Sequence, residues 1–263
     1  MKDLQHVRTR RQLFRLIAAG AASIPLLALS RKSASSANPN GTNQNNNPQN
    51  PCFLKGTRIS TPSGGRLVQD LQIGDEVQTL TGLKPIKWIG YNKFTKEEGK
   101  IWLDSVRPIR VARFAIGDHS PHSDLYLSPL HCIFFNEVLI PVKYLINGTS
   151  IAQSAPADVS AIEYYHIEFD RHEVLYAEGA LVESFFDGES EREYFSNFIE
   201  YERRYGTKRQ PKMTPFAPIL GYRNRRERIE GVARSLISNI VDVRDPVQIA
   251  RSQIARRAET MAV

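Results

Sequence analysis

Cys52 and His131 are the first residues in this sequence that could act together chemically. A cysteine sulfur attacks a carbonyl once its proton is removed, and cleavage of an amide also requires a group that protonates the departing nitrogen. Histidine can take either role. His131 lies in the apolar run around Ser128-Pro129-Leu130-His131, where a histidine is more often a core residue than a catalyst. The pair therefore indicates thiol chemistry only in combination with other groups.

A later segment adds acid–base candidates. Residues 164–175 contain two more histidines, His166 and His172, together with several acids. Thiol chemistry needs a nucleophile, a base and a proton donor, and the sequence has a candidate for each role.

His119 and His122 are three residues apart and could suggest metal ligands. They lie in a polar loop with a proline, and no cysteine is near them, whereas zinc sites use closed sets of nitrogen and sulfur ligands. We therefore expect neither a metal nor a cofactor.

The chain from Cys52 onward has the two-residue period of β-strands. Asn136-Glu137 predicts a hairpin turn within this region. Many short strands with frequent turn residues, and no strong helical run between them, predict a compact all-β domain. The expected strands are 52–61, 66–80, 84–91, 104–114, 125–135, 138–145, 161–169 and 173–186.

The net charge of +7 is unevenly distributed. Residues 1–37 carry seven Lys/Arg and one acid, and residues 199–263 carry fourteen and seven. Residues 38–198 carry fourteen Lys/Arg and twenty acids, so the β region is acidic. A domain-wide nucleic-acid surface needs excess positive charge, and we therefore expect no nucleic-acid partner.

The first 51 residues predict export. A basic start is followed by an apolar stretch, 16–29, that is short for a bilayer span, and by the small residues Ser35-Ser36-Ala37. We interpret 1–37 as an export signal, which places the protein in the periplasm, on the cell surface or outside the cell. Residues 9–14 resemble a twin-arginine signal, with an ordinary secretory signal or an uncleaved anchor as alternatives. Residues 38–51 are rich in Asn, Gln and Pro and predict a disordered spacer.

The basic end, 189–263, predicts a helical extension. Apolar residues in 225–242 recur with the period of an amphipathic helix. Asp245-Pro246 is typical of a helix start, and the second helix is expected to run to about Ala258. These helices either pack on each other or on the β domain, or they contact an anionic membrane surface or a partner protein.

Cys52 and Cys132 are the only cysteines, so the chain has no disulfide framework. A bridge between them could form in an oxidising compartment. It would consume the thiol that the chemistry requires.

Four sequence blocks resemble the Hint domain that Hedgehog autoprocessing domains and inteins share. The likeness is closest to the bacterial Hint-like group with a CFxxGT opening. It covers about Cys52 to Phe186, within a domain that we place at 52–188, and implies a compact Hint β fold. The blocks are 52–57, 68–77, 128–131 and 171–179.

The resemblance implies that the chain processes its own backbone. By resemblance, the Cys52 sulfur attacks the Pro51 carbonyl and converts the peptide bond into a thioester. His131 matches the histidine that protonates the Cys52 nitrogen as it leaves. Ser128 stands where the family usually has Thr, a hydroxyl that orients the same peptide, and His172 matches a later histidine that assists acid–base steps.

Three departures from the family shape the prediction. Inteins end in His-Asn, whereas this chain has Glu183-Ser184, so protein splicing is not expected. A carboxylate that would activate a sterol cannot be placed, which leaves water or another nucleophile as the acyl acceptor. Pro51 crowds the attacked carbonyl, and signal removal leaves only 38–51 to be released. The alternative is therefore a catalytically silent Hint scaffold that acts as an exported surface or envelope interaction module through its basic helices.

Overall fold

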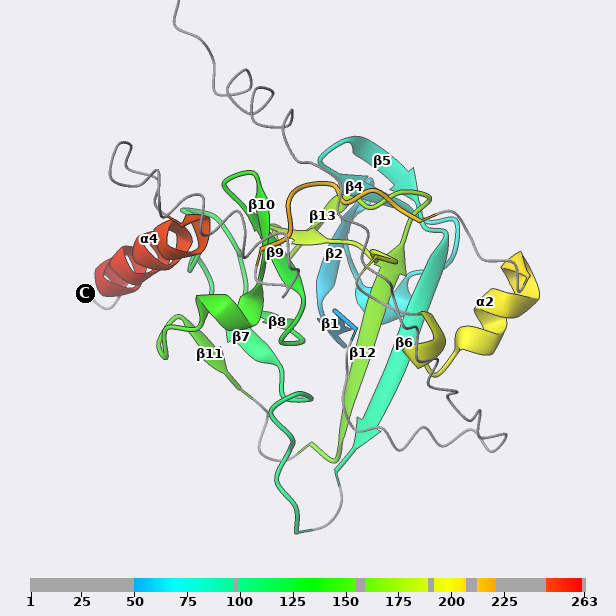
Figure 1. The fold of residues 1–263 in the computed structure, drawn as a ribbon, viewed down its shortest axis with the longest axis horizontal. Coiled ribbons are helices and arrows are strands. Elements are labelled where there is room, and N and C mark those ends of the chain that lie inside the picture. The colour runs from blue at the N-terminus through cyan, green and yellow to red at the C-terminus, as the bar shows by residue number, and fades with distance from the viewer. Residues whose placement is uncertain are drawn as a thin grey trace, which may run out of the picture. The chain divides into compact units, whose positions relative to one another are not determined.

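The structure is a computed structural model that describes residues 50–96, 99–154, 159–188, 192–206, 212–220 and 245–261. Within these ranges the chain forms two antiparallel sheets (Figure 1). Sheet A has the strand order β11 (Ile151–Gln153), β7 (Ile109–Val111), β8 (Leu125–Leu127), β1 (Phe53–Leu54), β12 (Ala161–Glu168), β6 (Trp88–Thr95). Sheet B has the strand order β10 (Val138–Pro141), β9 (Cys132–Phe135), β14 (Ala180–Glu183), β13 (Val174–Ala177), β2 (Arg58–Thr61), β3 (Gly64–Leu67). Two more strands lie off this path: β4 (Glu76–Thr79) pairs with β13, and β5 (Gly82–Pro85) pairs with β4.

Helical turns are few in the described part of the chain. Two α-helices, α2 (Phe198–Tyr205) and α4 (Pro246–Met261), follow the strands, and the short 3₁₀ helices are η1 (Val68–Asp70), η2 (Val142–Leu145) and η3 (Arg192–Tyr194). The predicted all-β fold with a helical C-terminal extension is confirmed. None of the described helices is both long enough and apolar enough to cross a membrane.

Two hairpins close through residues with positive φ. Asn136 and Glu137 have φ of 49° and 66° and join β9 to β10, as the sequence predicts. Glu178 and Gly179, with φ of 49° and 76°, join β13 to β14 in the same way. Two consecutive residues with positive φ match the right-handed twist of the flanking strands, which is why such loops make tight hairpins.

The predicted strands are longer than the observed ones. The range 52–61 is interrupted after β1, where Gly56 has φ of 95° and the Thr57 amide donates to the Leu54 carbonyl. The range 173–186 is a hairpin rather than one strand, and 104–114 contains only β7. Each predicted range joins a strand to the turn beside it. Turn residues can be apolar like strand residues, although their backbone groups do not form the hydrogen bonds of the sheet.

The break between β8 and β9 is the one that shapes the site. Sequence patterning predicted a single strand over 125–135, but Ser128-Pro129-Leu130 forms a turn in which the His131 amide donates to the Ser128 carbonyl. Pro129 has no amide hydrogen, so it cannot continue the ladder of hydrogen bonds. The turn transfers the chain from sheet A to sheet B and leaves Ser128 and His131 at the junction.

The main core is built from the inward faces of the strands. Its fully buried members include Phe53, Ile59, Val77, Leu127, Ile133, Ile167 and Leu175. Each such side chain stabilises the fold by about 1.5–3 kcal/mol relative to an exposed position. The strand β1 contributes Phe53, so the residue that follows Cys52 is anchored in this core.

Helix α4 is packed on the β domain. The Asp245 carboxylate accepts a hydrogen bond from the Val247 amide, which caps the helix start as predicted. Ala250 and Ile254, one turn apart, are fully buried in the main core. The apolar side of this helix is therefore covered by the β domain. The predicted helix over 225–242 lies outside the described residues, as do the export signal and all of the spacer before Asn50.

Helix α2 was not predicted. Its sequence is highly charged, and only Tyr201 is buried, in a second cluster with Trp88, Tyr164, Phe185 and Phe195. This cluster lies against β6 and β12, the long paired strands in Figure 1. Packing against these strands, rather than local helix propensity, accounts for the helix.

Gly90 makes room for this packing. A Cβ at position 90 would lie 2.6 Å from the Phe195 ring, which is closer than two carbons can approach. We expect Gly90→Ala to lower the free energy of unfolding by about 1–3 kcal/mol, because Phe195 must move out of its packed position. Urea denaturation measures the change. Gly65→Ala is the matched control, since its Cβ would meet Arg58 at an ordinary 3.5 Å; equal effects of the two substitutions would contradict the expected clash.

Candidate active site

The peptide bond before Cys52 is buried and held by Ser128. The Cys52 amide donates to the Ser128 hydroxyl oxygen at 2.8 Å, and that hydroxyl donates to the Asn50 carbonyl at 3.3 Å. The Ser128 amide donates in turn to the Cys52 carbonyl at 2.9 Å. One serine therefore bonds the chain on both sides of the Pro51-Cys52 peptide and fixes its orientation.

The Cys52 side chain is enclosed, with 1% of the residue exposed. Burial raises the pKa of its thiol well above the usual value, so the sulfur carries its proton at neutral pH. Neither Cys52 nor Cys132 is in a disulfide. Cys132 packs in a separate cluster with Leu139 and Val174, and the bridge considered from the sequence is not present.

His131 lies beside Cys52 and is completely buried. Its Nε2 is 3.0 Å from the Glu183 carbonyl oxygen, which can only accept, so the neutral ring carries its hydrogen on Nε2. Burial lowers the pKa of His131 to about 4, although backbone groups of Cys52 and Glu183 at the ring act in the opposite direction. The ring is therefore neutral at pH 7. Nδ1 keeps its lone pair and has no hydrogen-bond partner among the described residues.

His172 joins the site through Glu183. Its Nε2 lies 3.7 Å from the Glu183 carboxylate, and its Nδ1 accepts a hydrogen bond of 3.1 Å from the Phe216 amide. The ring stacks on Phe186 with centroids 4.8 Å apart. Burial, reinforced by the charge of His131, lowers the pKa of His172 to about 4, against a weaker opposing effect of the Ser184 backbone.

Two further residues of the site were given no role by the family resemblance, although His166 was one of the acid–base candidates in 164–175. His166 is almost fully buried, its ring lies edge-on to His131 with centroids 5.0 Å apart, and neither of its nitrogens has a hydrogen-bond partner in the described part of the chain. Burial, then the charges of His131 and His172, lower the pKa of His166 well below its usual value. The two-residue period of β12 already carried the signal for His166, because Ile162, Tyr164 and His166 point to the same side.

Glu183 is the second of these residues. Its carboxylate accepts a 2.7 Å hydrogen bond from the Cys132 amide, and its carbonyl accepts from His131. Glu183 therefore fixes the turn that carries His131 and also faces His172. No local pattern marks this residue, since its partners are about 50 positions away in the chain.

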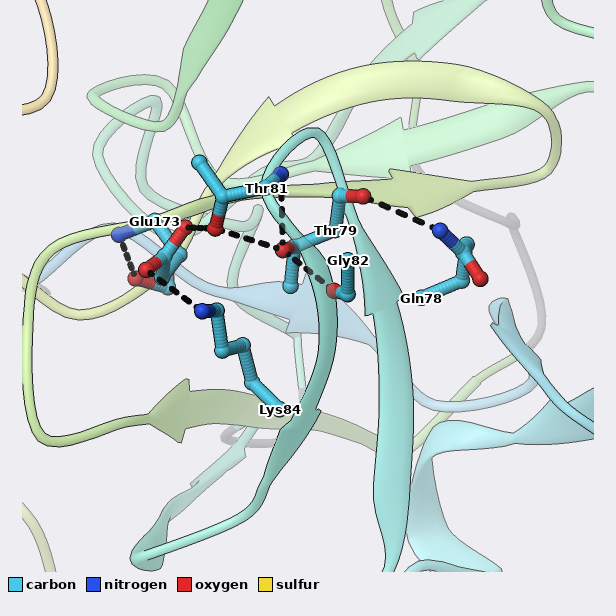
Figure 2. Close-up of polar contacts among 7 residues, drawn as sticks. Gln78, Thr79, Thr81, Gly82, Lys84 and Glu173 are labelled. Atoms are coloured by element: carbon cyan, nitrogen blue, oxygen red, sulfur yellow. Dashed lines mark hydrogen bonds and ion pairs between the residues drawn. The ribbon is translucent and has the colours of Figure 1, made fainter.

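Figure 2 shows the contacts of Glu173, the residue that follows His172. The Glu173 carboxylate accepts a hydrogen bond of 2.7 Å from Thr81 and lies 3.9 Å from the Lys84 ammonium. The Glu173 amide donates to the Ser184 hydroxyl. These contacts bind the loop before β13 to the β4–β5 hairpin and to the end of β14.

A cavity of about 620 Å³ lies beside His172. It is within the size range of small-molecule sites. Residues from five separate segments line it, among them Thr81, Lys87, Asp170, His172, Arg192 and Phe216. His119 and His122 lie elsewhere: His119 packs against Phe114, and His122 lies 3.6 Å from the Glu178 carboxylate. Among the residues described, no group of three or more His, Cys, Asp or Glu side chains could hold a metal ion.

A family model described as a Hint domain matches residues 51–189, which is more than half of the chain. The chain is similar to the gp41-1 intein, with 15% identity, a TM-score of 0.36 and coverage of 51% of this chain and 98% of that one. It is similar to a bacterial intein-like domain from Clostridium thermocellum, with 14% identity, a TM-score of 0.36 and the same two coverages. The search of curated proteins found no match.

Proposed function

Because the chain belongs to the Hint domain family, whose members are autoprocessing or splicing-type domains, we propose that it cleaves its own backbone between Pro51 and Cys52. The observation that carries the proposal is the Ser128 hydroxyl, which accepts a hydrogen bond from the Cys52 amide and donates one to the Asn50 carbonyl, beside a buried, neutral His131. The cleavage is a single-turnover reaction, with the chain as its own substrate.

The first step is an acyl shift from nitrogen to sulfur. The Cys52 sulfur forms a bond to the Pro51 carbonyl carbon, the bond from that carbon to the Cys52 nitrogen breaks, and one proton moves from sulfur to nitrogen. The thiol is protonated when the reaction begins, so a base must take this proton. His131 Nδ1 has a lone pair next to Cys52 and can carry the proton between the two atoms. Ser128 keeps the peptide oriented, which is needed because the shift from amide to thioester is uphill.

The end of the domain supports cleavage without splicing. Splicing needs an Asn side chain that cyclises, whereas this chain has Glu183 and Ser184 at the corresponding point. Both side chains already bind backbone amides, Glu183 that of Cys132 and Ser184 that of Glu173. The thioester is therefore resolved by water or by an external nucleophile.

The proposal extends to the location of the reaction. The predicted signal, 1–37, would export the chain, by the twin-arginine route if the Arg10-Arg11 pair acts as a twin-arginine signal. After removal of the signal, cleavage between Pro51 and Cys52 would release residues 38–51. Contact of the basic C-terminal helices with a membrane surface or a protein is also part of this proposal, and α4 keeps Arg251 and Arg256 exposed for it.

Intact-mass analysis of the full chain tests the function. Incubation with dithiothreitol or hydroxylamine, which attack thioesters, should produce a fragment that begins at Cys52. Cys52→Ala should remain full length, because it has no sulfur to form the thioester. Cys132→Ala is the matched control, since it removes the other buried thiol, and it should cleave like the wild type. A wild-type chain that stays intact in both reagents would instead identify the silent scaffold.

A further inference from the structure

A segment beyond the residues matched by the Hint family model is bonded to the edge of sheet A. We call residues 192–197 the edge segment. The strand β6 is the last strand of this sheet in the described chain. The Ser196 amide donates to the Tyr91 carbonyl of β6 at 2.9 Å, and the Tyr91 amide donates to the Asn197 side-chain oxygen at 2.9 Å. The Asn197 side chain also donates to the Ile89 carbonyl at 2.9 Å. The edge segment is therefore a fixed part of the sheet edge.

Phe195 is the buried side chain of the edge segment, with 2% of the residue exposed. Its ring lies over Gly90 of β6, where the absence of a Cβ leaves room for it. It meets the Trp88 ring edge-on with centroids 5.3 Å apart and stacks on the His166 ring with centroids 6.3 Å apart. Phe195 therefore covers one side of His166.

The strand register places His166 at the cleavage site. The pairing of β1 with β12 sets Phe53 opposite Tyr165, so the preceding residue, Cys52, lies opposite His166. Residues that face each other across two antiparallel strands have their side chains on the same face of the sheet. Cys52 and Phe195 accordingly belong to the same buried cluster. His166 thus connects the edge segment with the residue that carries the reactive sulfur.

The polar atoms around Phe195 make the space that it fills attractive to water. Neither nitrogen of His166 has a hydrogen-bond partner among the described residues, and the same holds for Trp88 Nε1. A space beside such atoms takes up water when it is large enough. Phe195 fills this space, and burial lowers the pKa of His166 well below its usual value. A charge on His166 would oppose the transfer of a proton to His131, whose ring is 5.0 Å away.

The other titratable groups packed around His166 belong to β1, β9, β12, α2, the edge segment and the loop before β13. They are Cys52, His131, Tyr164, His172, Tyr201 and the ion pair of Arg192 with Glu168. None of them is changed in the variants that follow.

We propose that Phe195 is a positioning residue of the cleavage site, which holds the His166 ring against His131 and excludes water from it. This inference rests on the proposed function, because a role in cleavage requires that the chain cleaves itself. The edge segment is then a working part of the site, although it lies outside the residues that the family model matches. With His166 fixed and uncharged, His131 can take the proton from the Cys52 thiol.

Phe195→Ala tests the exclusion of water, because loss of the ring leaves space beside His166 that water can fill. Proton NMR titration of the histidine rings in the full chain measures the protonation of each one. In the wild type His166 should stay neutral down to about pH 5.5, and in Phe195→Ala its midpoint should approach the ordinary value of about 6.5. His172 is the internal control, since it stacks on Phe186 and should titrate as in the wild type.

The same variant tests the role in cleavage. The measured quantity is the rate of cleavage in hydroxylamine, obtained by intact mass on the full chain and divided by the wild-type rate at the same pH. Phe195→Ala should lower this rate by about tenfold or more, since a misplacement of about 1 Å can cost about 10²-fold. The loss should deepen as the pH falls toward about 5.5, because His166 then gains a charge in the variant alone. A merely structural role would not produce this pH dependence.

Phe198→Ala is the matched control. It removes the same ring from the same cluster, but Phe198 stacks on Tyr201 instead of on His166, so both measurements should match the wild type. Phe195→Leu keeps an apolar side chain over Gly90 and should restore both measurements. Gly90→Ala displaces the Phe195 ring without removing it and should also let His166 titrate, which tests the inference even if Phe195→Ala does not fold.

Two results would overturn the inference and leave the proposed function intact. One is a His166 that stays neutral at about pH 5.5 in both Phe195→Ala and Gly90→Ala. The other is equal cleavage by Phe195→Ala and Phe198→Ala. In both cases hydroxylamine would still cleave the wild type. Absence of hydroxylamine cleavage in the wild type would reject the proposed function and, with it, the role of Phe195 in cleavage.

Discussion

Acidification from pH 7 to pH 5 should lower the free energy of unfolding by about 4 kcal/mol. The effect comes from His131 and His172, whose pKa values burial lowers to about 4, compared with about 6.5 in the unfolded chain. Between these two pKa values the unfolded chain binds more protons than the folded one, so stability is lost as the pH falls through this window. Each histidine accounts for about 2 kcal/mol at pH 5, and His166 acts in the same direction.

Two carboxylates with shifted pKa values titrate below this window. Asp124 and Glu163 have lowered pKa values, because hydrogen bonds from Arg110 and from Lys55 oppose the effect of burial. The stability that they contribute is lost only as the pH falls below the ordinary range of about 4. A comparison that stops at pH 5 therefore reports mainly on the buried histidines.

Urea denaturation at a series of pH values measures the loss. His131→Gln and His172→Gln should each remove about 2 kcal/mol of the pH dependence, because each deletes one buried titrating group. His119→Gln makes the same substitution at an exposed position and controls for the loss of an imidazole. If the variants at 131 and 172 keep the full dependence of the wild type, the histidine cluster is not its source.

Glu168→Gln should destabilise the fold by about 3–5 kcal/mol, the second large effect. The Glu168 carboxylate is fully buried, accepts two hydrogen bonds from Arg192 at 2.9 and 3.0 Å, and lies 3.1 Å from the Lys87 ammonium. The amide would leave two largely buried cations without most of their compensating charge. This network ties β12 to η3 and to the start of β6, so its loss should also loosen α2.

Asp104→Asn is the matched control for Glu168→Gln. It changes a carboxylate to an amide in an exposed pair with Arg107, and such pairs contribute about 1 kcal/mol or less. Urea denaturation of both variants at pH 7 gives the comparison. If Glu168→Gln lowers the free energy of unfolding no more than Asp104→Asn does, water stabilises the charges of Lys87 and Arg192 as effectively as the Glu168 carboxylate does.

The sequence predicted the fold class and several residues of the site, but not how the site is completed. The blocks around Cys52, His131 and His172 could be found because they resemble blocks of the Hint family in the same order, whereas local patterning alone would leave His131 a core residue. The structure brings Cys52, Ser128 and His131 into contact and links His172 to them through Glu183. The catalytic roles of these residues remain predictions, for which the cleavage assays above are the test.

The residues that were missed depend on long-range pairing. Glu183 becomes part of the site because β14 pairs with β9, and the sequence does not specify that neighbour. Phe216 reaches His172 through its backbone amide, a group that every residue except proline has. Helix α2 forms because its aromatic side chains pack against residues of β6. Local helix propensity does not predict such packing.

The position of β1 determines what the cut leaves behind. Phe53 is paired on one side with Tyr165 of β12 and on the other with Leu127 of β8, so the strand after the cut is central in its sheet. Cleavage would therefore create a chain terminus inside a folded domain instead of at its surface. The new amino group would be desolvated, which disfavours its charged form and keeps it a competent nucleophile next to the thioester. Unless the acyl group leaves promptly, reversal to the intact peptide competes, so the rate of thioester resolution would decide how much of the protein is cleaved.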